Sequence, residues 1–140
     1  VWGRPHYLEA PDFRPLADVP PRTGRRWQVA LAHGHLVRDR HDLARSWRIY
    51  PADVAASDRD YVALGHWDVA CRLLAGRTLA CYSGSPVTPG WATERLSGCA
   101  LLITLDEAAG VQVRAHRFAD AAAHHEVPAV DPDPWLEPDS

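Results

Sequence analysis

The stretch Asp60-Tyr61-Val62-Ala63-Leu64-Gly65-His66-Trp67-Asp68 contains a strand-like apolar run that is followed directly by a polar cluster. An uninterrupted apolar run of this length is typical of a strand that is buried on both faces. A second stretch has the same layout. The apolar run 27–32 ends at His33-Gly34-His35, where glycine permits a sharp change of direction. Both polar clusters therefore stand at the carboxyl end of a predicted buried strand.

Two strand ends of this kind predict that their polar residues form one ligand site. In open α/β sheets, ligands bind outside the carboxyl ends of the strands, so we expect both clusters at one edge. Positions i and i+2 of an extended chain point the same way, which lets His66 and Asp68 face one metal pair. Imidazole together with carboxylate suits zinc, manganese or iron. A solvated or hydrogen-bonded histidine at a strand end is the alternative interpretation of His33.

The rest of the chain predicts an α/β architecture with a β-rich end. Residues 1–26 are expected to form a short strand and an irregular connection, and residues 36–50 a surface loop or short helix. Residues 51–57 predict one or two helical turns, because proline suits the first turn of a helix. Further strands are predicted at 69–74, 78–82, 99–105 and 111–118, which makes the second half an antiparallel meander.

Composition narrows the class of protein. The chain has 140 residues, 46% of them hydrophobic and 24% charged, which is typical of one ordinary globular domain. No stretch approaches the roughly 18 consecutive apolar residues of a membrane-spanning helix. The net charge of −3 argues against a protein that coats nucleic acid by bulk charge. Cys71, Cys81 and Cys99 lie in apolar contexts without C-x-x-C spacing, which predicts buried free thiols in a reducing, cytoplasmic compartment.

The composition of the two ends of the chain leads to further predictions. Residues 126–140 hold five acidic residues, four prolines and no basic residue, which is typical of a loosely held tail. We therefore predict a folded part over 1–120 and an acidic, proline-rich tail over 121–140. The chain starts with Val1 and contains no methionine, which predicts that it is part of a longer polypeptide.

Taken together, the motifs resemble the C-terminal half of calcineurin-like metallophosphoesterases, nearest the branch of SbcD-like DNA repair exonucleases. That branch reads D-Y-x-A-L-G-H-x-H, then a hairpin, then Y-x-G-S-P. Residues 60–68 and Tyr82-Ser83-Gly84-Ser85-Pro86 match these patterns, and Ala32-His33-Gly34 matches the preceding histidine motif. The resemblance covers residues 27–118. It implies a four-layer α/β/β/α sandwich, of which this chain supplies the C-terminal, mostly β half.

The resemblance also implies a site with two divalent metal ions, manganese before iron or zinc. His33 and His66 would bind one ion, and Asp68 would bind the other. His35 competes for the role of His33, because the register around His-Gly-His is ambiguous. His33 is preferred because it stands directly at the strand end. Trp67, Ser83 and Ser85 are candidate substrate contacts, with a purely structural turn as the alternative for the two serines.

Two features depart from the family pattern. The family usually has G-H-x-H, whereas this chain ends the motif with Asp68. A carboxylate can still bind a hard or borderline cation, or it can leave that metal position weak. The family's first-half motifs, D-x-H, G-D-x-x-D and G-N-H-[DE], do not occur in this sequence. We therefore expect the chain to need an N-terminal half, carried by a separate or cleaved chain.

The implied activity is hydrolysis of phosphate mono- or diesters by a hydroxide that the two metal ions activate. A phosphoester substrate is the expected small partner, and no membrane is expected. Nucleic acid is one option, because seven arginines between residues 22 and 48, with Trp27 and Trp47, could form a phosphate-binding rim. A solvated arginine-rich loop is the other interpretation. The alternative function is a non-catalytic binding or scaffold member of the same fold with a degraded metal site.

Overall fold

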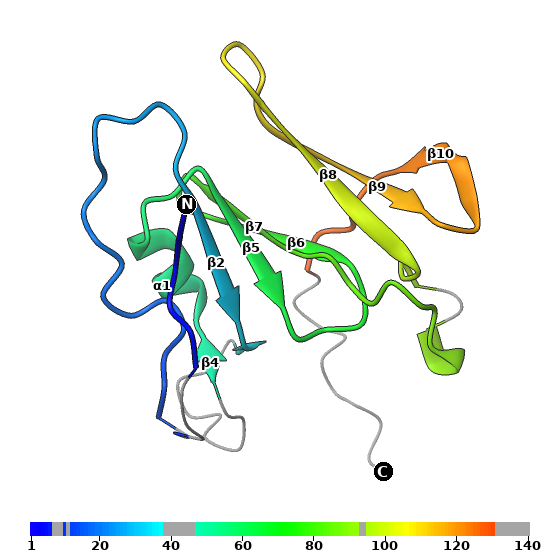
Figure 1. Cartoon of the computed structure of the whole chain (residues 1–140), viewed down its shortest axis with the longest axis horizontal. Helices are drawn as coiled ribbons and strands as arrows, with labels where there is room; N and C mark the ends of the chain where they lie inside the picture. Colours follow the sequence, from blue (N-terminus) through cyan, green and yellow to red (C-terminus); the bar gives the residue numbers. More distant parts are fainter. Residues whose placement is uncertain (7–9, 11, 38–46, 93–94, 131–140) are drawn as a thin grey trace.

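The computed structural model describes residues 1–6, 10, 12–37, 47–92 and 95–130, and its framework is a five-stranded mixed sheet (Figure 1). The strand order is β1-β2-β5-β7-β6. Neighbours from β1 to β7 run parallel, and β6 returns antiparallel to β7. The strands are β1 (Trp2–Gly3), β2 (Val29–His33), β5 (Tyr61–Gly65), β6 (Cys71–Ala75) and β7 (Thr78–Tyr82).

The pairing of β2 with β5 confirms that the two predicted strand ends meet at one edge. Val29 lies opposite Tyr61, and His33 lies opposite Gly65. The Gly34 amide continues this ladder by donating to the Gly65 carbonyl oxygen at 3.1 Å. The two strands therefore end at the same level, and the polar residues that follow them emerge side by side.

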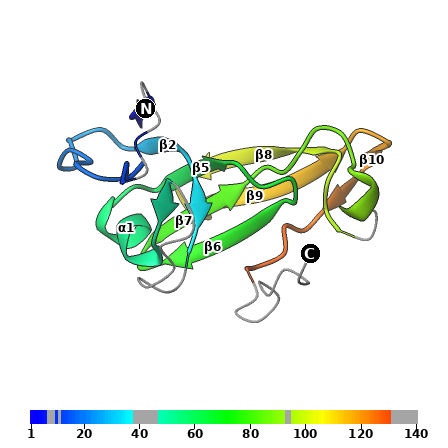
Figure 2. The ribbon, with the colours of Figure 1, turned by 90° about the horizontal axis from the view of Figure 1, so that it is seen from below.

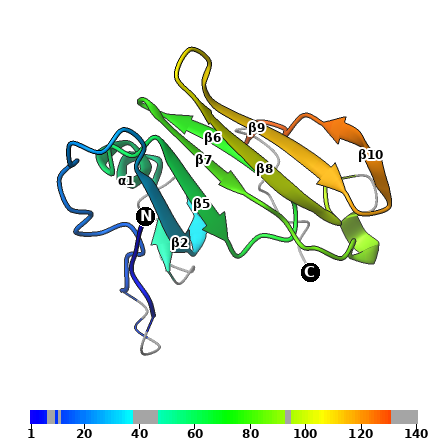
Figure 3. The ribbon, with the colours of Figure 1, turned by 45° about the horizontal axis from the view of Figure 1, so that its top comes forward.

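A three-stranded antiparallel sheet of order β10-β9-β8 lies beside β6 and β7 (Figure 3). Its strands are β8 (Cys99–Asp106), β9 (Gly110–Arg117) and β10 (Asp120–His125). Sheet structure thus continues past the boundary expected at residue 120. Beyond it, Val127 is buried, and the Arg72 amide of β6 donates to the Pro128 carbonyl oxygen at 2.9 Å. The expected tail over residues 131–140 lies outside the described residues.

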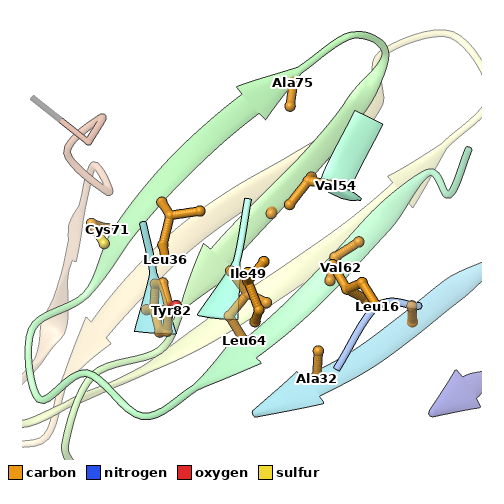
Figure 4. Packing of buried hydrophobic residues seen from close by; sticks show 12 residues of the cluster. Leu16, Ala32, Leu36, Ile49, Val54, Val62, Leu64, Cys71, Ala75 and Tyr82 are labelled. Atoms are coloured by element: carbon orange, nitrogen blue, oxygen red, sulfur yellow. The ribbon is translucent and has the colours of Figure 1, made fainter. Parts of the chain in front are cut away.

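The main core covers one face of the five-stranded sheet (Figure 4). The helix α1 (Pro51–Ala56) brings Val54 into it and packs against β6 and β7, at one end of these strands in Figure 2. A short parallel pair, β3 (His35–Leu36) and β4 (Arg48–Ile49), adds Leu36 and Ile49. Burying each such aliphatic side chain stabilises the fold by about 1.5–3 kcal/mol.

The structure confirms a mixed-sheet, mostly β architecture with few helices. Apart from α1, the helices of the described residues amount to one 3₁₀ turn over Gly90–Ala92. No helix in the described ranges combines the length and the apolar character needed to cross a membrane. The prediction of buried thiols is confirmed, since all three cysteines are free and buried. The patterns did not predict the β3–β4 pair or β10.

Candidate functional site

Three of the four predicted metal ligands gather at the carboxyl edge of β2 and β5. The rings of His33 and His66 have centroids 5.4 Å apart, and those of His35 and His66 are 5.5 Å apart. His33 and His66 are exposed, so their rings can meet a ligand from solvent. The cluster exists because the parallel register places the end of one strand directly against the end of the next.

Two glycines leave space for their neighbours at this edge. A Cβ atom at Gly65 would lie 3.0 Å from Nδ1 of His33. A Cβ atom at Gly34 would lie 2.1 Å from the Trp47 carbonyl oxygen, which cannot move away cheaply because it is backbone. Glycine at both positions therefore permits the close approach of the strand ends.

A fourth histidine joins the cluster, and the sequence patterns did not point to it. His6 donates from Nε2 to the His33 carbonyl oxygen at 3.2 Å. Its ring contacts Phe13, with centroids 4.2 Å apart, and Trp47, with centroids 4.8 Å apart. His6 is isolated in the sequence and follows only the two-residue strand β1, so only the tertiary contact identifies it as part of the edge.

A pocket of about 580 Å³ opens beside the histidines, between the ends of β1, β2 and β5. Leu31 and Ala63 contribute an apolar floor, and Arg4, His6 and His33 contribute polar groups. The Arg4 guanidinium pairs with the Asp18 carboxylate at 3.1 Å. The pocket therefore combines apolar surface with polar groups, of which Arg4 is already paired with an acidic residue.

The Trp67 side chain, which the sequence suggested as a substrate contact, packs against two residues of its own chain. Its indole stacks on the Tyr82 ring, with centroids 4.1 Å apart and an angle of 21° between the planes. Its Nε1 donates to Nδ1 of His35 at 3.3 Å. Tyr82 therefore covers one face of the indole. A substrate contact by another part of the Trp67 ring stays a prediction.

Among the described residues, Asp68 and the three histidines do not form a complete metal centre. Within the described ranges, no three histidine, cysteine or acidic side chains lie together so that they could hold a metal ion. The exposed Asp68 instead contributes its carbonyl oxygen, which accepts a hydrogen bond from the Ser85 amide at 2.8 Å. Metal ligation by His33, His35, His66 and Asp68 stays a prediction.

The loop with the two candidate serines is held by its own hydrogen bonds. The Ser85 hydroxyl accepts from the Val87 amide at 3.2 Å, and the Ser85 carbonyl oxygen accepts from the Gly98 amide at 2.9 Å. Ser83 is exposed, and its hydroxyl lies 3.5 Å from the Gly84 carbonyl oxygen. These contacts favour the structural turn for Ser85, and substrate contact by either serine stays a prediction.

The arginines of the expected phosphate-binding rim are partly used inside the fold. Arg22 pairs with the buried Asp60 at 2.8 Å, and Arg26 pairs with Glu107. Arg48 lies 3.8 Å from Asp12. Arg38, Arg40 and Arg45 lie outside the described residues. Arg25 is exposed. Three of the four described arginines of the rim therefore lie next to acidic residues of the same chain.

In comparisons with known proteins, no family model, no curated protein and no solved structure matches the chain. The histidine geometry and the sequence motifs therefore carry the functional interpretation.

Proposed function

We propose that this chain is the C-terminal half of a metal-dependent phosphoesterase of the calcineurin-like group, which hydrolyses phosphate mono- or diesters. The supporting observation is the pair His33 and His66 at the ends of two adjacent parallel strands, with ring centroids 5.4 Å apart. In this proposal, α1 and the five-stranded sheet belong to a four-layer α/β/β/α sandwich. The free thiols fit a cytoplasmic location.

The histidine pair fits part of a ligand set for manganese, iron or zinc. Neutral imidazole is a common ligand of these ions. Protein-bound divalent ions take four or more ligands, so two nitrogens are not enough. Asp68 is a further candidate on this chain, and the other ligands would come from the N-terminal half. When bound, such ions would stabilise negative charge on a phosphoryl oxygen and lower the pKa of water.

The chain's own residues would hold the substrate next to this pair. Arg4, whose guanidinium has more N–H groups than the one paired with Asp18, lies on the polar side of the pocket, where an anionic phosphate would be attracted. Leu31 and Ala63 offer apolar surface for the ester group. Gly65 contributes by having no side chain, because a Cβ atom there would crowd the His33 ring.

The face of the sheet opposite the core supports the proposed N-terminal partner. Leu31 is 50% exposed, whereas its neighbours Ala30 and Ala32 are buried in the core. Side chains alternate along a strand, so Leu31 points to the other face. Leu74 on β6 is likewise 69% exposed beside the buried Ala75. Exposed apolar residues on one sheet face favour an interaction surface.

Replacing His66 tests the proposal in the protein that contains both halves. His66→Ala is expected to abolish manganese-stimulated hydrolysis of bis(p-nitrophenyl) phosphate, because one imidazole ligand is lost. His125→Ala is the matched control, since His125 belongs to β10 and its buried Nε2 has no hydrogen-bond partner. Full activity of His66→Ala would rule out the proposed role.

The 140-residue chain also allows a direct test of metal binding. Paramagnetic Mn²⁺ is expected to broaden the ring NMR signals of His33 and His66 at lower concentrations than those of His116 and His125 on the other sheet. His66→Ala should remove the selective broadening of His33. Equal broadening of all four rings would speak against a metal pair at the strand ends.

A non-catalytic scaffold or binding module of the same fold is the second candidate function. Two observations favour it: aspartate stands at position 68, and the described ranges hold no group of three side chains that could bind a metal ion. Metal analysis of the assembled protein separates the two functions. About two ions per protein support the enzyme, and the absence of metal supports the scaffold.

A further inference from the structure

β8 is an edge strand of the three-stranded sheet, and within the described residues only β9 pairs with it (Figure 3). A free edge exposes a row of backbone N–H and C=O groups that can pair with another chain. The Phe118 amide donates to the Gly98 carbonyl oxygen at 2.9 Å, in register with the β8–β9 ladder. Because hydrogen-bonded and non-hydrogen-bonded pairs alternate along an antiparallel ladder, Leu101, Ile103 and Leu105 direct their backbone groups outward.

The other sheet edges among the described residues are protected in ways that β8 is not. At the edge of β6, the Arg72 backbone bonds to the backbone of Pro128 and Val130, at 2.9 and 2.7 Å. The strands β1, β3 and β4 have two residues each, and the pairing of β10 with β9 is irregular. Covering, shortening and bulging are common ways to prevent edge pairing. β8 has eight residues, no proline and no charged residue before Asp106, so its edge is open to a further strand.

The side chains of β8 favour pairing with another copy of the same strand. Leu102, in the middle of β8, is 54% exposed. In an antiparallel pairing across a two-fold axis at Leu102, this residue lies opposite its own copy, in a non-hydrogen-bonded pair where side chains are closest. Leu101 of one copy then bonds to Ile103 of the other through their outward backbone groups. The exposed leucine is thereby partly removed from water in both copies.

The charges at the two ends of β8 are complementary in this arrangement. Asp106 is exposed at the hairpin end of the strand. Two arginines lie together at the other end: Arg95 is exposed, and Arg117 donates from Nη2 to the Arg95 carbonyl oxygen at 3.0 Å. Arg117 is the β9 residue opposite Cys99, where β8 begins. Two-fold antiparallel pairing brings the acidic end of each copy to the basic end of the other, whereas parallel pairing would place like charges together.

We propose that β8 pairs antiparallel with β8 of a second copy of this chain, which joins the two three-stranded sheets into one continuous sheet. The described part of each chain has one long open edge, so the pairing uses it completely and the assembly closes at two copies. The inference goes beyond the proposed phosphoesterase function and does not depend on it. The histidine edge and the exposed Leu31 both belong to the five-stranded sheet, and β8 belongs to the other.

Sedimentation velocity of the 140-residue chain tests the pairing. At the protein concentrations of NMR samples, a species with the mass of two 15.5 kDa chains is expected. It should dissociate on dilution, because one strand from each copy gives a small interface. A chain that stays monomeric over the whole concentration range would overturn the proposal. Polymers of increasing mass would also overturn it, because a closed pair has no free edge left.

The variant Leu102→Asp tests the position of the two-fold axis. It places two carboxylates opposite each other, so the chain should sediment as a monomer at every concentration. Leu74→Asp is the matched control: Leu74 is 69% exposed on β6, and its replacement should leave the dimer intact. A folded Leu102→Asp variant that still dimerises, or a Leu74→Asp variant that is equally monomeric, would contradict pairing through β8.

Disulfide cross-linking tests the same contact without weakening it. Leu102→Cys is expected to form a disulfide between two copies in oxidised glutathione, because opposite residues of a non-hydrogen-bonded pair have Cα atoms about 4.5 Å apart. Leu74→Cys is the control and should stay uncross-linked, and the native cysteines are buried. Equal cross-linking of both variants, or none in either, would refute the pairing.

The protein that contains both halves distinguishes a second copy from another occupant of the edge. The Leu102→Cys cross-link is expected there too. If the N-terminal half instead covers β8, the cross-link and the dimer will both be absent from the assembled protein, and the proposal is then wrong. Hydrolysis of phosphoesters by the same sample is a separate measurement, so the two proposals can fail independently.

Discussion

His66 follows the glycine at the end of β5 and has a backbone φ of 130°. This part of φ space is strained for any residue with a Cβ atom and is adopted readily by glycine. Residues with such strain cluster at functional sites, where the side chain is needed despite its conformational cost. A histidine in this position therefore favours a role for the imidazole over a role in folding.

Glycine at position 66 should relieve this strain. His66→Gly is expected to have a free energy of unfolding about 1 kcal/mol above that of His66→Ala, because only alanine keeps the unfavourable φ. Urea unfolding of the two variants measures the difference. Both variants lack the imidazole, so the comparison separates backbone strain from side-chain contacts. Equal stability, or a more stable alanine variant, would contradict a strained backbone at this position.

The amino end of β5 is held by a buried carboxylate. Asp60 is 8% exposed and accepts a hydrogen bond from the Gln28 amide at 2.7 Å. Arg22 donates to both of its oxygens at 3.0 and 2.8 Å. The Asp60 backbone also bonds to Gln28 and Leu79, which flank it in the sheet. This network aligns β2, β5 and β7 at the end opposite to the histidines.

Removing the carboxylate should destabilise the sheet. Asp60→Ala removes the carboxylate partner of Arg22, which keeps only the Asp58 and Arg26 carbonyl oxygens, and the acceptor of the Gln28 amide. We expect a loss of about 2–4 kcal/mol in unfolding free energy. The loss is below that of a fully buried pair because the Arg22 side chain is 23% exposed. Chemical denaturation measures it. Asp18→Ala is the control, since Asp18 is 87% exposed in its pair with Arg4 and should change stability by less than about 1 kcal/mol.

Among the strands, those with a long apolar run or a clear alternation of apolar and polar residues were predicted from the sequence, whereas β3, β4 and β10 were not. The runs 27–32 and 61–64 became β2 and β5, and the hairpin at 75–77 joins β6 to β7 as expected. The β10 strand reads Asp-Ala-Ala-Ala-His-His, which has neither the alternation nor the β-branched residues of a strand. It forms because β9 offers an edge with unpaired backbone groups.

The five-stranded sheet contains buried thiols that stay uncharged at neutral pH. Burial raises the pKa of Cys71 from 9.0 to about 12 and that of Cys81 from 9.0 to about 11. Above about pH 9, the unfolded chain therefore loses thiol protons that the folded chain retains. The free energy of unfolding must then fall as the pH rises, by up to about 1.4 kcal/mol per proton and pH unit.

The two thiols should account for the first part of this alkaline loss. The variant with Cys71→Ala and Cys81→Ala is expected to show a shallower fall in unfolding free energy than the wild type between about pH 9 and pH 10. Tyr61 and Tyr82, whose pKa burial also raises, add to the loss at higher pH in both proteins. Urea unfolding at several pH values provides the measurement, and parallel curves for the two proteins would contradict it.

The local pattern was sufficient to place the buried strands, to end them at His33 and His66, and to bring these ends to one edge. It could do so because strand formation depends on nearby apolar residues, and parallel strands share a direction. Tertiary structure decided the rest: His6 joined the edge, and Trp67 turned toward His35. Side-chain partners of this kind depend on packing between distant segments, which local residue spacing does not encode.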